Sequence, residues 1–278
     1  MASMIASVFI FSMVDVIVKL LDEQYSAMQI FFFRSLFAIL PAAVALRAEG
    51  SSRRLKTRYW PIHVLGSFLM MAFLVCNFLA LPRISLAEFY VISYSAPLLI
   101  VLMGTVLLAE KINLSQGVAV AAGFGGVLYI FQPSGEVFNA GGFLALAGTV
   151  LFSITMIVVR ILGRTETEGV TAFYFAVIGA IASSVFLPWV WITPDLYGTA
   201  LLITLGILGG IGQLLMAKAF KDAAAVMVSP FQYTSIFWGV LFGYVFFEAR
   251  PDPVVLPGFV IIASSGLFLL VQSRQSVE

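Results

Sequence analysis

The sequence predicts an all-α integral membrane protein with ten transmembrane helices, arranged as two inverted five-helix repeats. Three observations lead to this prediction. The 278-residue chain is 61% hydrophobic and only 10% charged, whereas roughly a quarter of the residues of a soluble domain are charged. It contains ten apolar runs of about 20 residues, the length that crosses the hydrocarbon core of a bilayer. Its two halves match each other at an offset of about 140 residues, so the chain is interpreted as a repeat first.

The ten apolar runs define the expected spans. Their connections are short and leave no room for an aqueous domain. A lipid-exposed backbone must satisfy its own hydrogen bonds, so each run is expected to be helical. In chain order the predicted spans are 2–21, 28–46, 61–81, 86–108, 115–131, 141–160, 170–190, 199–219, 226–247 and 255–272.

The internal repeat sets the expected domain organisation, with a first repeat over residues 1–132 and a second over 141–273. The matching landmarks are a Phe-Ser pair ahead of a basic residue, an aromatic triplet, and a glutamate ahead of spaced glycines. These landmarks begin at Phe11 and Phe152, at Phe31 and Phe173, and at Glu110 and Glu248. Five spans per repeat is an odd number, so the halves must be inverted in the bilayer. Inverted repeats are typical of alternating-access carriers, whose substrate site lies near mid-membrane.

The distribution of basic residues predicts the orientation. With the N-terminus in the cytoplasm, most of the 15 Lys and Arg residues fall in inner loops or the tail. Lys19, Arg83 and Arg250 fall outside, and Arg34 lies within a span. The positive-inside rule therefore predicts that both termini are cytoplasmic. The N-terminus enters an apolar run almost at once, which indicates a first span rather than a cleaved signal peptide.

Composition excludes several functions. The net charge is +1 and the basic residues form no stripe, so no nucleic-acid partner is expected. Cys76 and His63 are the only residues of their types, which excludes an intrachain disulfide and a His- or Cys-based metal cluster. No phosphate-binding G-x-x-x-x-G-K-[ST] motif is present, and no catalytic constellation is evident. We therefore expect no cofactor, no metal and no enzyme activity, with an intramembrane enzyme as the remote alternative.

Charged and polar residues in the outer third of the spans form a predicted gate or coupling group. A charge in lipid costs several kcal/mol, so these groups should face inward and pair. Asp15 and Arg34 lie at the same depth in consecutive spans and are expected to form an ion pair. A structural pair between the first two helices is the alternative to a gate or proton-coupling role. The full predicted set is Asp15, Lys19, Arg34, Asn77 and Glu88, with His63 near the cytoplasmic side as a titrating gate group or an interfacial residue.

Aromatic and amide residues near mid-membrane form the predicted substrate site. Tyr90 and Tyr94 share a helical face in the fourth span, and Ser229, Gln232 and Tyr233 share one in the ninth. Buried Tyr and Gln side chains need hydrogen-bond partners, which are either a ligand or a neighbouring helix. The full predicted set is Tyr90, Tyr94, Gln213, Ser229, Gln232, Tyr233 and Trp238.

Several stretches together resemble the EamA-domain members of the drug/metabolite transporter (DMT) superfamily. They are Phe33–Ala38, Ser95–Pro97, the run from Gly104 through Glu110 to Gly117, and its echo from Gly239 through Glu248 to Gly258. More loosely, 13–19 and 230–233 resemble a proteobacterial branch associated with uptake of cofactor-like metabolites. The resemblance implies ten helices, a central cavity and a bacterial inner-membrane location.

Residues and resemblance together predict a secondary transporter that moves a small organic metabolite by alternating access. An amino acid or a similar neutral or zwitterionic compound, moved by export, is the first expectation. Uptake of a cofactor-like metabolite such as S-adenosylmethionine or riboflavin is the alternative. The expected partners are this small molecule, the lipid bilayer and a candidate coupling proton, and a monomer should suffice because each half completes the other.

Overall fold

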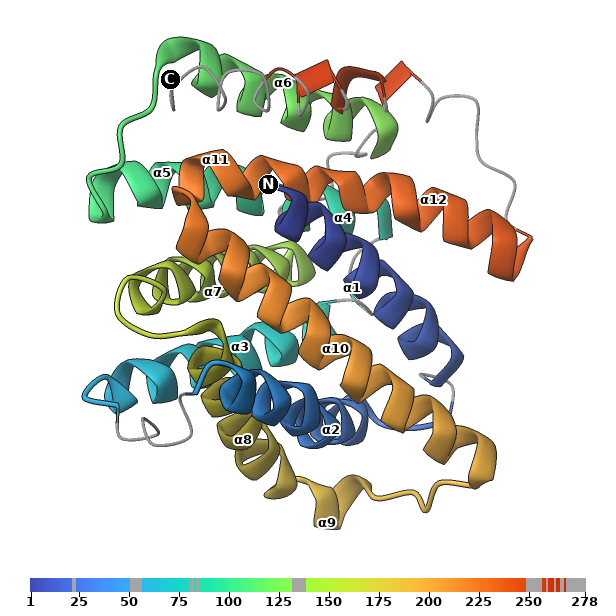
Figure 1. Ribbon diagram of the computed structural model, residues 1–278. Coiled ribbons are helices and arrows are strands. Elements are labelled where there is room, and N and C mark those ends of the chain that lie inside the picture. The colour runs from blue at the N-terminus through green and yellow to red at the C-terminus, as the bar shows by residue number, and fades with distance from the viewer. Residues whose placement is uncertain are drawn as a thin grey trace. The chain divides into compact units, whose positions relative to one another are not determined.

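The fold is given by a computed structural model that describes residues 1–21, 24–50, 57–80, 83, 86–131, 139–248, 257–258, 260–262, 264–265 and 268. The described part of the chain is helical and contains no strand, as Figure 1 shows. The elements are α1 (Ala2–Leu21), α2 (Ala27–Ala48), α3 (Trp60–Ala80), α4 (Leu86–Ser93), α5 (Ala96–Leu107), α6 (Leu114–Phe131), α7 (Ala140–Leu162), α8 (Glu168–Ser184), α9 (Leu187–Val190), α10 (Leu196–Asp222), α11 (Ala225–Val228), the 3₁₀ helix η3 (Ser229–Tyr233) and α12 (Thr234–Phe247).

Seven segments of the described chain are long and apolar enough to cross a membrane. They are Ala2–Leu21, Ala27–Ala48, Trp60–Asn77, Phe89–Leu107, Ala140–Leu162, Leu196–Asp222 and Ala225–Phe246. Helices α6 and α8 are apolar but shorter. The predicted tenth span, 255–272, lies mostly outside the described residues. The protein is therefore a multi-pass, membrane-embedded helical protein.

Two of the predicted spans, 86–108 and 226–247, contain an interruption of the helix. The first is interrupted at Tyr94 and Ser95, between α4 and α5. The second passes from α11 through η3 into α12. Pro97 lies in the first turn of α5, and Pro230 lies in the first turn of η3. Proline has no N–H and crowds the preceding turn, so each of these prolines interrupts the helical hydrogen-bond ladder.

The chain divides into two compact units, and each unit combines segments from both halves of the sequence. The first, here the α2/α10 unit, contains residues 2–71 and 158–222. The second, the α4/α12 unit, contains Met1 and residues 72–157 and 223–278.

Glycines of α10 allow the close helix packing inside the α2/α10 unit. A Cβ atom at Gly206 would lie 2.4 Å from Cβ of Phe37, and one at Gly210 would lie 2.4 Å from Cγ of Pro41. Small residues that let backbones approach are the usual basis of helix association in membranes. The buried Gln29 side chain also joins α2 to the segment after α9, because Nε2 donates to Ile192 O at 2.6 Å and Oε1 accepts from Ile192 N at 2.9 Å.

Glu110 connects two distant segments inside the α4/α12 unit. Its Oε2 accepts a hydrogen bond from the backbone N–H of Val226, in the first turn of α11, at 3.3 Å. The first N–H groups of a helix have no intrahelical acceptor, so this carboxylate supplies one. The preceding Ala109 and the repeat-related Glu248 both have left-handed backbones, with φ of 52° and 53°. A left-handed residue therefore follows each helix, directly after α12 and two residues after the end of α5.

Candidate functional site

The strongest candidate site lies in the α4/α12 unit, at the two broken helices. The break between α4 and α5 lies in the first half of the sequence, and the break at η3 lies in the second half. Transporter folds place substrate and ion sites at such paired helix interruptions, where irregular backbone can be tolerated at membrane depth.

Direct contacts join the two breaks. The Ser229 hydroxyl donates to Pro97 O at 3.5 Å. The Ser235 hydroxyl donates to Gln232 O at 2.7 Å and lies 3.1 Å from the Tyr94 hydroxyl. Tyr94 also packs against the cluster of buried apolar residues that contains Tyr233. The structure therefore brings together four of the predicted site residues and adds Ser235, which the sequence analysis did not identify.

Two polar groups at this site have no partner in the described part of the chain. The Tyr233 side chain is 1% exposed, and its hydroxyl has no hydrogen-bond partner there. The same holds for Nε2 of Gln232, one residue earlier in η3. A buried polar group without a hydrogen bond costs about 1–3 kcal/mol, so such groups are rare unless a ligand or water completes them. Both groups are hydrogen-bond donors suited to an oxygen or nitrogen acceptor of a bound molecule.

Gly123 of α6 provides the space for the Tyr233 ring. A Cβ atom at Gly123 would lie 3.0 Å from both Cδ2 and Cε2 of the ring, and 3.1 Å from the Ser265 hydroxyl. The Ser265 hydroxyl donates to Ala119 O one turn earlier in α6. A side chain at position 123 would therefore require the Tyr233 ring or α6 to shift.

Two other predicted substrate-site residues lie at different points of this unit. Tyr90 lies in α4, one turn before Tyr94, and is 41% exposed. The rings of Tyr90 and Tyr94 stack with their centroids 6.2 Å apart. Trp238 lies further along α12, where its ring packs edge-on against Phe237 at 4.8 Å and against Phe242 at 6.2 Å. Trp238 belongs to an aromatic row along α12 rather than to the contacts between the two breaks.

Asp15 and Arg34, from the predicted gate group, lie on α1 and α2 of the α2/α10 unit. Their charges interact electrostatically, but among the described contacts they form no direct ion pair. The predicted direct ion pair between Asp15 and Arg34 is therefore wrong, and the two charges interact over a longer distance. The Arg34 guanidinium instead lies over the Phe11 ring, 5.6 Å from its centroid. Asp15 and Lys19 are both exposed and lie one turn apart on α1, whereas the sequence analysis expected them to face inward.

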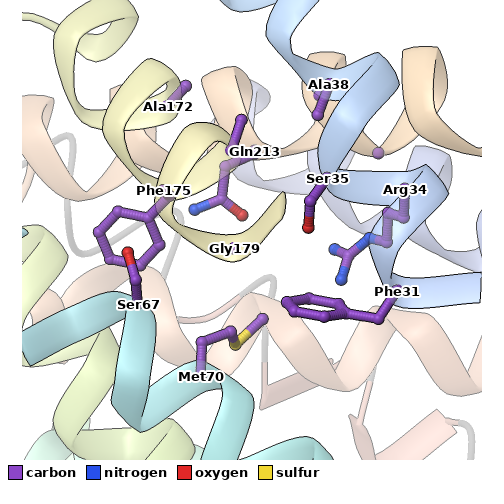
Figure 2. Close-up of a pocket in the computed structure, with 13 residues that line it drawn as sticks. Phe31, Arg34, Ser35, Ala38, Ser67, Met70, Ala172, Phe175, Gly179 and Gln213 are labelled. Atoms are coloured by element: carbon purple, nitrogen blue, oxygen red, sulfur yellow. The ribbon is translucent and has the colours of Figure 1, made fainter. Parts of the chain in front are cut away.

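Arg34 also lines a cavity with Gln213, which had been predicted as a substrate-site residue. The cavity lies between α2, α3, α8 and α10 of the α2/α10 unit and has a volume of about 50 Å³. Figure 2 shows the Arg34 guanidinium, the Ser35 hydroxyl and the Gln213 amide extending toward it from α2 and α10. Ser67, Met70 and Phe175 form part of the remaining wall. This meeting could not be predicted from the sequence, because Arg34 and Gln213 lie on helices that are far apart in the chain.

The remaining gate residues are separate from this cavity. His63 is fully buried in α3, with its ring stacked on Tyr174 at 4.6 Å and with neither ring nitrogen hydrogen-bonded to a described residue. Asn77, in the α4/α12 part of α3, directs Oδ1 toward Gly148 of α7, where a Cβ atom would lie 2.6 Å away. The side chain of Glu88 lies outside the described residues.

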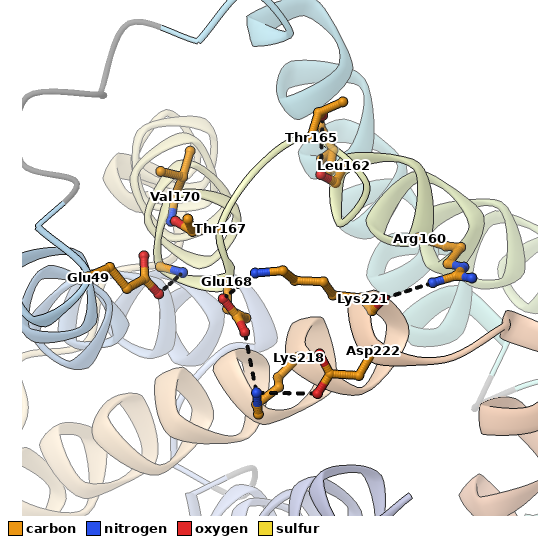
Figure 3. Close-up of polar contacts among 11 residues, drawn as sticks. Glu49, Arg160, Leu162, Thr165, Thr167, Glu168, Val170, Lys218, Lys221 and Asp222 are labelled. Atoms are coloured by element: carbon orange, nitrogen blue, oxygen red, sulfur yellow. Dashed lines mark hydrogen bonds and ion pairs between the residues drawn. The ribbon is translucent and has the colours of Figure 1, made fainter. Parts of the chain in front are cut away.

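A charged network joins the end of α10 to the start of α8. Glu168 contacts Lys221 at 3.0 Å and Lys218 at 3.7 Å, and Lys218 also pairs with Asp222 at 3.2 Å (Figure 3). Burial raises the pKa of Glu168, but its backbone hydrogen bond and the two lysines outweigh burial and lower that pKa below the usual value. Arg160 donates to Phe220 O at 2.6 Å, and Glu49 accepts from Gly169 N at 3.1 Å. The ends of α2, α7, α8 and α10 are therefore joined by polar contacts.

Within the described residues, no group of three or more His, Cys, Asp or Glu side chains could hold a metal ion. The candidate site at the two breaks consists of aromatic rings, hydroxyls and an amide.

Comparison with known proteins identifies the family. The profile of the EamA-like transporter family matches residues 1–132 and again 139–271. A solved crystal structure has the same fold, with a TM-score of 0.84 and 19% identity over 100% of this chain and 98% of that one.

Two curated relatives have names that state what they transport, and the directions of transport in these names are opposite. The S-adenosylmethionine uptake transporter of Rickettsia bellii is 27% identical, over 95% of this chain and 90% of its own. The pseudopaline exporter CntI of Pseudomonas aeruginosa is 25% identical, over 91% of this chain and 89% of its own. The family and these relatives are transporters, not enzymes. The chain belongs to the EamA-like transporter family of the drug/metabolite transporter superfamily, whose members carry small molecules across membranes.

Proposed function

We propose that this protein is a secondary carrier that moves a zwitterionic metabolite across a bacterial inner membrane by alternating access. Its ten helices would form two inverted repeats, over 1–132 and 141–273, with both termini in the cytoplasm. The observation that carries the proposal is the pair of helix breaks at repeat-equivalent positions, joined by the contact between Ser235 and Tyr94. Paired interruptions of this kind are the best structural pointer to a carrier's binding site.

The chemistry of the site supports a cargo with both a hydrogen-bond acceptor and an apolar or planar part. The hydroxyl of Tyr233 and Nε2 of Gln232 provide buried donors without partners among the described residues. The rings of Tyr94 and Tyr233 provide flat apolar surfaces. No charged side chain takes part in the contacts described between the two breaks, which favours a net-neutral cargo over a polyanion or polycation.

Export of an amino-acid-like compound is the first proposed direction and cargo. Uptake of a cofactor-like metabolite such as S-adenosylmethionine or riboflavin is the second, and the Rickettsia bellii relative is the specific observation in favour of S-adenosylmethionine. In an alternating-access carrier the gradients of cargo and coupling ion drive the net flux, and the same site serves both directions. The cargo is therefore the first property to determine.

We propose further that a proton is the coupling ion and that Asp15 is the group which carries it. Asp15 is the carboxylate of α1, and its electrostatic partner Arg34 lies on α2 of the same unit. Intramembrane carboxylates are frequent proton carriers in transporters because their charge is costly when it is not compensated. Each monomer would work alone, since one chain contains both repeats.

Counterflow in proteoliposomes tests the proposal. Purified protein would be reconstituted with unlabelled compound inside, and uptake of the labelled compound would be followed for amino acids, S-adenosylmethionine and riboflavin. Counterflow with one compound, absent from protein-free vesicles, is the expected result. A pH step should then change the net flux but not the equilibrium exchange. Folded protein that exchanges none of these compounds would reject the proposed cargo classes.

A further inference from the structure

The cavity beside Arg34 is a second candidate binding site, apart from the two helix breaks. It lies wholly within the α2/α10 unit. A volume of about 50 Å³ holds roughly three or four water molecules, since one water needs about 10–15 Å³ on this measure. Pockets for drug-sized molecules are about 300–1,000 Å³. The cavity therefore suits a ligand of only a few atoms.

The positive charge of Arg34 is not neutralised by a direct contact with an anionic group of the described chain. In the described part of the chain its guanidinium has no hydrogen-bond acceptor and no direct ion pair, and its neighbours are the Phe11 ring and the more distant charge of Asp15. No Asp or Glu is among the residues that line the cavity. A cation held away from bulk water is costly unless an acceptor pairs with it.

Two further donors face the same space as Arg34. The Gln213 amide and the Ser35 hydroxyl line the cavity, and within the described chain neither forms a hydrogen bond. Ser67 contributes differently, because its hydroxyl donates to His63 O at 2.9 Å. The free hydrogen-bond donors of the cavity are therefore Arg34, Gln213 and Ser35 (Figure 2).

Gly209 of α10 leaves the space that the Arg34 side chain occupies. A Cβ atom at Gly209 would lie 3.1 Å from Nε and 3.2 Å from Cγ of Arg34. The absence of a side chain at position 209 therefore lets Arg34 lie flat along α10 at the cavity wall. A larger residue would push the guanidinium away from Gln213.

We propose that this cavity binds a small carboxylate, of the size of formate or acetate, through Arg34, Gln213 and Ser35. The planar guanidinium fork pairs with the two oxygens of a carboxylate better than with a spherical ion. The apolar part of the wall includes Phe31 and Phe175, which suits a small apolar group beside the carboxylate.

Isothermal titration calorimetry on the full chain in nanodiscs tests this assignment. Sodium formate should give saturable binding with one site per chain, measured against formamide, which has the same shape without the charge. Acetate should bind and bulky pivalate should not. Absence of saturable binding, binding of formamide or pivalate as tight as that of formate, or equal affinity for chloride would each overturn the proposal.

Single substitutions test whether formate binds at the residues named above. Arg34→Gln should weaken formate binding more than tenfold, and Gln213→Leu should weaken it several-fold. Gly209→Ala keeps every donor but displaces the guanidinium, so it should also weaken binding and provides a test if Arg34→Gln does not fold. Gly239→Ala is the matched control, because a Cβ atom there meets nothing within 4 Å. Unchanged affinity in folded Arg34→Gln or Gly209→Ala protein would place the anion elsewhere and contradict the assignment.

Discussion

The ring of Tyr233 lies against the backbone of Gly123, so close that a Cβ atom at position 123 would be 3.0 Å from two ring carbons. This contact joins α6 to η3, the interrupted segment that carries two buried donors without partners among the described residues. The position of the Tyr233 hydroxyl therefore depends on a residue from the other sequence repeat.

Gly123→Ala is expected to reduce transport by displacing the Tyr233 ring. The contact distance is tighter than ordinary van der Waals packing, so either the ring or α6 must shift by a few tenths of an ångström. Gly125→Ala is a matched control in the same helix, because its Cβ atom would meet nothing within 4 Å. Initial rates of counterflow should fall for Gly123→Ala alone. Equal rates for the two variants would separate Tyr233 from transport.

Tyr233→Phe is expected to impair transport while leaving stability unchanged or slightly higher. The hydroxyl is buried without a partner in the described chain, so its removal relieves a desolvation cost of about 1–3 kcal/mol. If the hydroxyl instead binds cargo, its loss should weaken the apparent affinity by about tenfold, or 1.4 kcal/mol. Thermal unfolding and the half-saturation concentration for counterflow measure the two effects. A purely structural hydroxyl would lower the unfolding temperature and leave cargo affinity intact.

Asp15→Asn is expected to remove the response of net flux to a pH step. The substitution keeps the size of the side chain but deletes the charge that interacts with Arg34. Exchange at equal pH should persist, because it needs no net proton movement. Asp222→Asn provides a control in the same unit, since that carboxylate is half-exposed and pairs with Lys218. A pH response that survives in Asp15→Asn would assign coupling to another group.

Gly206→Ala is expected to destabilise the α2/α10 unit by about 1–3 kcal/mol, the usual cost of overpacking. The added Cβ atom would lie 2.4 Å from Cβ of Phe37 and 2.9 Å from the backbone oxygen of Phe33, and neither atom belongs to a flexible side-chain end. The unfolding temperature in detergent should therefore fall, whereas Gly239→Ala should leave it unchanged. A stable Gly206→Ala protein would show that α2 and α10 do not pack at this distance in the membrane.

The charged network around Glu168 is expected to make stability depend on pH in mildly acidic solution. Its pKa is lowered in the folded state relative to the usual 4.5, so the ionised form favours folding. This contribution is complete above that usual value and is lost as the pH falls through the lower folded pKa. Unfolding temperatures between pH 7 and pH 3 should fall less steeply for Glu168→Gln than for the parent protein. Parallel curves would show that solvent screens the network completely.

The sequence by itself determined the membrane class and most of the helix positions. Runs such as 2–21 and 141–160 are apolar over the thickness of a bilayer, and a backbone in lipid must be helical, so length and composition suffice. The sequence did not decide whether the helices containing Pro97 and Pro230 are interrupted. Pro97 and Pro230 marked the places, but a proline in a long apolar run produces either a kink or a break.

Tertiary structure alone decided which side chains meet. Arg34 and Gln213 share a cavity, and Gly123 meets Tyr233, although each pair comes from different sequence repeats. Asp15 and Arg34 show the converse, because they lie at equal depth in consecutive spans of the same half and yet form no direct ion pair among the described contacts. Periodicity gives the depth of a residue along its own helix. Contact also depends on the rotation and spacing of neighbouring helices. Packing at residues such as Gly206 and Gly210 determines both, and it exists only in the folded protein.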